Sequence, residues 1–113
     1  MDSGTSRVAA EPRNTVPVMI KLTVSYPHGE GTTFDHDYYA ASHVPLCNEV
    51  FAPVKTEVDK GIDGPSAASV NFYFDTMEAM QASFGNPRMG DVMADVANYT
   101  NIAPVMQVSE IVG

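Results

Sequence analysis

The chain has few of the features that would mark a secreted or membrane protein. Only one of its 113 residues, Cys47, is a cysteine, so no disulfide bond can form within the chain. A protein without internal disulfides suits a reducing compartment. The first residues carry no apolar stretch as long as a signal peptide, and no segment has the roughly 20 apolar residues of a membrane-spanning helix. We therefore expect a soluble, cytoplasmic protein with no membrane partner.

Basic residues are also scarce. The chain has 6 Lys and Arg residues against 14 Asp and Glu residues, which gives a net charge of −8. This balance excludes a protein that binds nucleic acid or an anionic membrane through its overall charge. On a small domain an acidic excess commonly serves only solubility.

The sequence has no glycine-rich phosphate loop and no dinucleotide fingerprint. His36 lies between Asp35 and Asp37, but neighbours in a helix point in different directions and cannot chelate one ion together. His36 and His43 are two helical turns apart, which is too far for a shared ligand. We expect neither a cofactor nor a metal.

Length and composition indicate one folded domain preceded by a tail. Residues 1–17 are rich in Ser, Thr, Ala and Pro and have no hydrophobic period, so we expect a flexible tail. Residues 18–113 carry regular patterns and form the domain. A chain of this size buries only about two-thirds of its unfolded surface as a monomer, so association with a second copy would stabilise it.

Hydrophobic periods predict six main elements. In chain order they are a strand over 19–26, a helix over 34–44, a strand over 54–59, a strand over 68–74, a helical region over 77–96 and a strand over 105–112. This βαββαβ order is the ferredoxin-like arrangement, an α+β fold whose antiparallel sheet has helices on one face. Whether Ile20, Leu22 and Val24 or the alternate residues face the helices stays open. The bare face predicts a homodimer, because a second copy is its simplest cover.

Local signals set the ends of the helices. Thr32 or Thr33 is expected to cap the first helix, and Asp75 the helix that begins near 77, where Glu78 completes a capping box. Pro45 lacks an amide hydrogen, so it should break or kink the first helix near residues 43–44. The expected apolar stripe of this helix consists of Phe34, Tyr38 and Ala41.

The first predicted helix also carries the best candidates for chemistry. Tyr39 and His43 are four residues apart and therefore share one face of the helix. Imidazole exchanges protons near neutral pH, so we predict that His43 is a catalytic acid/base and that Tyr39 binds substrate or orients His43. The structural alternative is an imidazole that caps the broken helix beside a buried, hydrogen-bonded phenol.

Other side chains, namely two polar strand residues, Cys47 and the methionines, are weaker candidates for a functional role. Asn71 and Tyr73 form a polar strip on a predicted strand and are candidate substrate-binding residues, although solvent exposure would explain them equally well. Cys47 has no visible activating base and is expected to be inert. The methionines are expected to fill the core or, alternatively, to line a soft pocket for a planar ligand.

Three segments together resemble the EthD family: residues 19–27, the stretch from Tyr38 and Tyr39 to Leu46, and residues 73–80. The resemblance implies a dimeric α+β barrel of two ferredoxin-like protomers. It implies relatives among cofactor-independent oxygenases, polyketide cyclases, lactone isomerases and aromatic decarboxylases, and members are often labelled reductases or oxidoreductases. The histidine and the preceding tyrosine of the family fall on His43 and Tyr39.

Three functions are compatible with these observations. The first is a small dimeric enzyme, of the oxidoreductase or a related class, that acts on a hydrophobic aromatic, quinone-like or lactone compound with His43 as acid/base. The second is a non-catalytic protein that binds such a ligand for a degradation pathway. The third is a haem-binding protein of the same fold with His43 as axial ligand.

Overall fold

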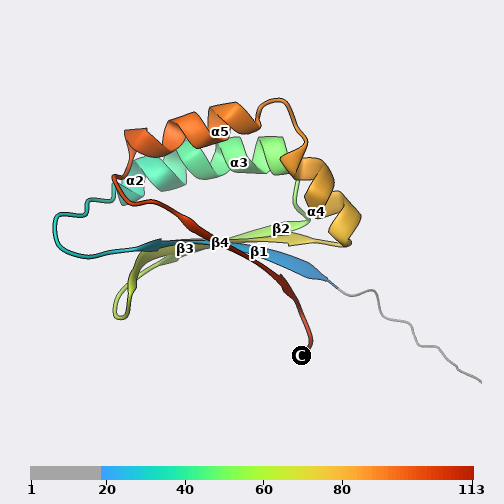
Figure 1. Cartoon of the computed structure of the whole chain (residues 1–113), viewed down its shortest axis with the longest axis horizontal. Helices are drawn as coiled ribbons and strands as arrows, with labels where there is room; N and C mark the ends of the chain where they lie inside the picture. Colours follow the sequence, from blue (N-terminus) through green and yellow to red (C-terminus); the bar gives the residue numbers. More distant parts are fainter. Residues whose placement is uncertain (1–18) are drawn as a thin grey trace, which may run out of the picture.

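The computed structural model describes residues 19–113, so the predicted tail over 1–17 lies outside the described residues. Four strands form one sheet: β1 (Ile20–Pro27), β2 (Lys55–Lys60), β3 (Ser66–Phe74) and β4 (Val105–Glu110). Their order is β2-β3-β1-β4, and every neighbouring pair is antiparallel. The helices cover one face of this sheet (Figure 1). The predicted ferredoxin-like α+β fold is therefore confirmed.

Alternation along β1 decides which face meets the helices. Leu22, Val24 and Tyr26 are buried beneath the helices. Lys21, Thr23 and Ser25 are only half-buried, on the other face, and they pair with Tyr73, Asn71 and Ser69 of β3. The bare face of the sheet is thus polar rather than apolar.

The first helical segment continues through Pro45 without the predicted break, but its geometry changes at residues 43–44, where a break or kink was predicted. It consists of α2 (His36–Tyr38), a π-helical turn (Tyr39–His43) and α3 (Val44–Phe51). In the π turn the N–H of Val44 donates to the carbonyl of Tyr39, five residues back. The wider turn gives the Pro45 ring room, and Pro45 falls in the first turn of α3, where no amide hydrogen is needed.

This segment also begins and packs differently from the prediction. Asp35, rather than Thr32 or Thr33, is the N-cap, and its carboxylate accepts a hydrogen bond from the Tyr38 amide. Ala41 is exposed, whereas Tyr39, His43 and Cys47 are buried. The stripe that meets the sheet therefore runs through the tyrosine and the histidine themselves.

The second helical region is divided into α4 (Met77–Phe84), α5 (Met89–Asp95) and a 3₁₀ turn (Val96–Asn98). In the connection before α5, the side-chain oxygen of Asn86 accepts a hydrogen bond from the amide of Arg88 at 2.8 Å. α5 contacts α3, and the two helices lie side by side over the sheet (Figure 1). Among the described residues, no helix has both the length and the apolar character needed to cross a bilayer.

Thr76, rather than Asp75, caps α4, because its hydroxyl oxygen accepts a hydrogen bond from the Ala79 amide at 3.1 Å. Replacing Thr76 with Ala should lower the free energy of unfolding by about 1 kcal/mol, the usual cost of losing an N-cap. Asp75→Ala is the matched control and should change stability by less than about 0.5 kcal/mol. Urea denaturation at one protein concentration measures both, and a larger loss for Asp75→Ala would contradict this assignment.

Candidate functional site

His43 and Asp95 form the central contact of the site. The imidazole Nδ1 of His43 lies 2.9 Å from Oδ2 of Asp95, which is the last residue of α5. The His43 side chain is 4% exposed and that of Asp95 is 15% exposed. The packing of α5 on the first helical segment thus joins two residues that are 52 positions apart in the sequence.

Two neighbours hold the Asp95 carboxylate in place. The hydroxyl of Tyr38 donates to Oδ1 at 2.7 Å, and the side-chain amide of Asn98 donates to the same oxygen at 2.9 Å. Each carboxylate oxygen therefore has a defined partner, and Oδ2 is left for His43. Tyr38, predicted to pack in the apolar stripe, instead supports the carboxylate through its hydroxyl.

Burial and hydrogen bonding set the charges of the pair. Burial lowers the pKa of His43 below its ordinary value and outweighs the opposing effect of Asp95. Burial raises the pKa of Asp95, but the hydrogen bonds from Tyr38, Asn98 and His43 together outweigh it and hold that pKa below its usual range. At neutral pH the pair is a neutral imidazole beside a carboxylate.

The carboxylate charge of Asp95 determines the tautomer of the neutral His43 ring. An ionised carboxylate can only accept hydrogen bonds, so the single ring proton of His43 must lie on Nδ1. Nε2 then carries a lone pair, and no described residue donates a hydrogen bond to it. A carboxylate that orients a histidine in this way leaves the far nitrogen ready to accept a proton.

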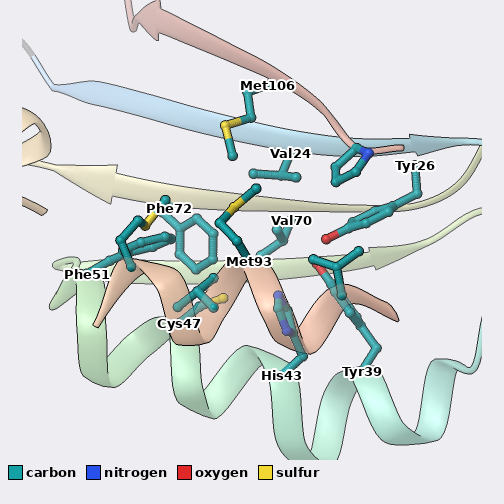
Figure 2. A pocket seen from close by; sticks show the side chains of 14 residues that line it. Val24, Tyr26, Tyr39, His43, Cys47, Phe51, Val70, Phe72, Met93 and Met106 are labelled. Carbon is teal, nitrogen blue, oxygen red and sulfur yellow. The ribbon is translucent and has the colours of Figure 1, made fainter. Parts of the chain in front are cut away.

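A pocket lies between the sheet and the helices next to this imidazole (Figure 2). Apart from His43 and two tyrosines its walls are apolar or sulfur-bearing side chains, among them Val24, Cys47, Phe51, Val70, Phe72 and Val92. The space between its walls is about 350 Å³ when counted out to the open solvent. A water-sized sphere can move through only about 20 Å³ of it, which is room for about one water molecule.

Two methionines also line the pocket and are accessible from outside. Met93 of α5 is 49% exposed and Met106 of β4 is 43% exposed, so they mark the side that faces solvent. Methionine is unbranched and repacks readily. A ligand larger than water would enter by displacing these side chains, in keeping with the sequence-based alternative of a soft pocket lined by methionine.

Tyr39 stands beside His43 in the same wall. The two rings are nearly parallel, with centroids 5.6 Å apart. Tyr39 is 1% exposed, and its hydroxyl has no hydrogen-bond partner among the described residues. Burial, followed by the influence of the nearby Tyr26 hydroxyl, raises the pKa of Tyr39 above its usual range. The structure therefore brings the two helix candidates together, with Tyr39 as a protonated phenol.

The strand candidates lie elsewhere. Asn71 and Tyr73 are on the bare face of the sheet, opposite the buried Val70 and Phe72 that line the pocket. The Asn71 amide oxygen accepts from Thr23 at 2.7 Å, and the Tyr73 hydroxyl donates to Glu57 at 2.6 Å. Neither residue belongs to the pocket of His43, because successive residues of a strand point to opposite faces.

Cys47 lines the pocket as a buried free thiol. Burial raises its pKa to about 12, so the thiolate that would act as nucleophile is scarce at neutral pH. This agrees with the interpretation of Cys47 as inert.

Asp95 is the residue that the sequence analysis missed. It follows the apolar positions Met89, Val92 and Met93 near the end of a helix, where an acidic side chain usually faces solvent. Only the packing of α5 on the first helical segment reveals its role. The one available signal was the need of a functional histidine for an orienting carboxylate, which does not say which of 14 acidic residues supplies it.

Comparison with known proteins places this architecture. The family model described as the EthD domain matches residues 28–103. A solved EthD-like protein from Ralstonia eutropha JMP134 is 37% identical, with a TM-score of 0.77 and coverage of 87% of this chain and 96% of the other. An uncharacterized 11.0 kDa protein from the thcB–thcC intergenic region of Rhodococcus erythropolis is 28% identical over 88 residues, which are 74% of this chain and 85% of that protein.

A more distant structure shares the fold alone. SnoaB, a cofactor-independent oxygenase from Streptomyces nogalater, is 10% identical with a TM-score of 0.63, over 87% of this chain and 96% of SnoaB. The resemblance found in the sequence is confirmed by the family model and by the 37% identical structure: the chain belongs to the EthD family.

Proposed function

We propose that the protein is an enzyme that moves a proton on a small hydrophobic compound, with His43 as general acid/base and Asp95 as the residue that positions it. The observation that carries this proposal is the 2.9 Å contact between the His43 imidazole and the Asp95 carboxylate in the wall of an apolar pocket. A structural histidine would need neither the free Nε2 nor the hollow.

Asp95 and His43 have different roles in the proposed reaction. Asp95 keeps the proton on Nδ1 and stabilises the imidazolium that forms when Nε2 takes a proton from the substrate. Burial lowers the pKa of His43, so the ring is already in its basic form at neutral pH. In the low dielectric of the pocket, the attraction between the imidazolium and Asp95 is stronger than it would be in water.

The walls of the pocket favour hydrophobic substrates of the aromatic, quinone-like or lactone type. Apolar side chains form most of the lining, and neither Lys nor Arg is part of it. An anionic compound would have no cation to pair with there and would face the Asp95 carboxylate and a net charge of −8. A neutral compound with an ionisable C–H or O–H group meets neither obstacle.

The reaction class is proposed as oxidoreductase or a related isomerase, cyclase or decarboxylase. SnoaB, which shares the fold, is a cofactor-independent oxygenase. Removal of a proton makes an aromatic or enolic compound more electron-rich, and such an anion is the reductant that dioxygen requires when no cofactor takes part. The same deprotonation begins a proton-shift isomerisation, so one histidine serves either outcome.

We also propose that the protein is a homodimer. Val105 and Val108 of the edge strand β4 are each more than 40% exposed, and an edge strand with exposed apolar side chains favours association. The protomers would then extend the fold to the dimeric α+β barrel that the family resemblance implies. Sedimentation equilibrium of the full chain tests this, and a monomer at micromolar concentration would contradict it.

The function is tested by incubating the protein in D₂O with a panel of neutral lactones, enolisable aromatic ketones and hydroquinones. Proton NMR follows the loss of acidic C–H signals and the appearance of products. The proposal expects catalysed exchange or turnover for at least one class, above the buffer rate. A compound that binds the pocket and is released without exchange or turnover would favour the non-catalytic binding protein instead.

A further inference from the structure

The hydroxyl of Tyr39 is an unsatisfied polar group in an otherwise well-bonded core. Among the described residues it is the one buried side-chain nitrogen or oxygen without a hydrogen-bond partner. A buried polar atom left unpaired costs about 1–3 kcal/mol of stability. Such an atom calls for an explanation, and a missing ligand is one.

The neighbours of Tyr39 do not supply the partner. Tyr26 packs edge-on against Tyr39 at 5.5 Å between ring centroids, but its hydroxyl is 2.7 Å from that of Tyr99. The Nδ1 atom of His43 is bonded to Asp95. Phe34, also in contact with the Tyr39 ring, has no polar atom. Tyr39 is part of the pocket wall, so a ligand in the pocket is the candidate partner for its hydroxyl.

Tyr39 and His43 give this pocket one polar end. Their side chains rise together from the first helical segment towards the sheet, while methionine, aliphatic and phenylalanine side chains, with Cys47 and Tyr26, line the remainder of the pocket (Figure 2). The raised pKa of Tyr39 keeps the phenol protonated, so it can donate a hydrogen bond. The free Nε2 of neutral His43 can accept one.

We infer that the ligand is a neutral, small apolar ring compound with one hydroxyl or enol oxygen, which accepts a hydrogen bond from Tyr39 and donates its own proton to His43. This inference rests on the proposed function and names its substrate class. Tyr39 then also stabilises the oxyanion that forms when His43 removes the proton, because a protonated phenol can donate a hydrogen bond to the charge that develops.

The free protein provides the first test. Tyr39→Phe removes only the unpaired hydroxyl, so the variant should be as stable as the wild type or more stable. Tyr26→Phe is the matched control, since it removes a hydroxyl bonded to Tyr99. We expect it to lower the melting temperature. A loss of stability for Tyr39→Phe equal to that of Tyr26→Phe would show that the Tyr39 hydroxyl has a protein partner and would overturn the inference.

Binding of a matched pair of probes provides the second test. 4-Fluorophenol and 4-fluorotoluene have nearly the same shape, and ¹⁹F NMR measures the affinity of each. The wild type should bind the phenol about tenfold more tightly, as expected for one good hydrogen bond in a buried site. Tyr39→Phe should abolish most of this preference and leave the affinity for 4-fluorotoluene unchanged.

The outcomes separate this inference from the proposed function. Equal affinity of the wild type for both probes, or a preference that survives in Tyr39→Phe, would overturn the role of Tyr39, whatever the turnover experiments give. Failure of both probes to bind would overturn the ligand class. A preference that depends on Tyr39, found together with turnover that is indifferent to His43, would support the binding role and contradict the catalytic one.

Discussion

Replacing His43 with Gln is expected to lower the rate of the proton-transfer reaction by about 10²–10⁴-fold, the usual contribution of a positioned acid/base. Glutamine is similar in size and can keep a hydrogen bond to Asp95, but its amide cannot take up a proton at neutral pH. The effect should fall on kcat, because the apolar walls that bind the substrate stay in place. Initial rates on the substrate found by the D₂O screen measure it.

The matched control for this variant is His28→Gln. His28 is exposed, its Nε2 atom lies 2.8 Å from the backbone carbonyl of Gly64, and neither of these residues lines the pocket. The control should retain full activity. Circular dichroism and the melting temperature should show that both variants are folded. Undiminished turnover by folded His43→Gln would contradict the catalytic assignment.

Replacing Asp95 with Asn is expected to lower activity by about 10–100-fold, because a hydrogen bond to a charged group contributes about 1.5–3 kcal/mol. The change has a specific chemical reason. The amide nitrogen of Asn can donate to Nδ1 and thereby move the ring proton to Nε2, the atom that must accept the substrate proton. The variant keeps the positions of the two side chains but loses the His43 tautomer that can accept the substrate proton.

The pH profile of this variant distinguishes positioning from a merely structural role. Asp95 raises the pKa of His43, against the larger lowering by burial. Without the carboxylate the pKa of His43 falls further, so the acid limb of kcat/KM should move to lower pH while the plateau drops. Tyr38→Phe, which removes one support of the carboxylate, should give smaller effects on both. An acid limb that stays in place in Asp95→Asn would contradict the pairing.

The overall fold was accessible from the sequence because its signals are local. Alternation in 20–26 and 68–74 gives strands with one buried side each, and the order of elements leaves few topologies. The two faces of the sheet could not be told apart in advance. Leu22 and Val24 face the helices only because the helices settle on that side, and the period of a strand is the same from either side.

The first helical segment shows where local reasoning ends. Pro45 disfavours a regular helix, but a wider π turn can accommodate it without ending the helix. A period of 3.6 residues predicted the stripe over Phe34, Tyr38 and Ala41, and Ala41 is instead exposed. The pairing of Tyr39 with His43 was predictable because four residues span about one turn of the helix.

The rest of the site depends on contacts between distant segments. Asp95 reaches His43 across two packed helices, and the orphaned hydroxyl of Tyr39 can be recognised only when all its neighbours are known. Asn71 and Tyr73 illustrate the reverse case. Their polar character suggested a pocket, but alternation places them on the bare face of the sheet.

The most direct test of the account is nitrogen-15 NMR of the His43 ring in the folded protein, followed over pH. We predict a neutral ring at pH 7 with its proton on Nδ1, an unprotonated Nε2, and a pKa below the usual histidine value of about 6.5. A proton on Nε2, or a His43 pKa at or above that of a free histidine, would contradict the claim that this imidazole is a base held by Asp95 in an apolar pocket.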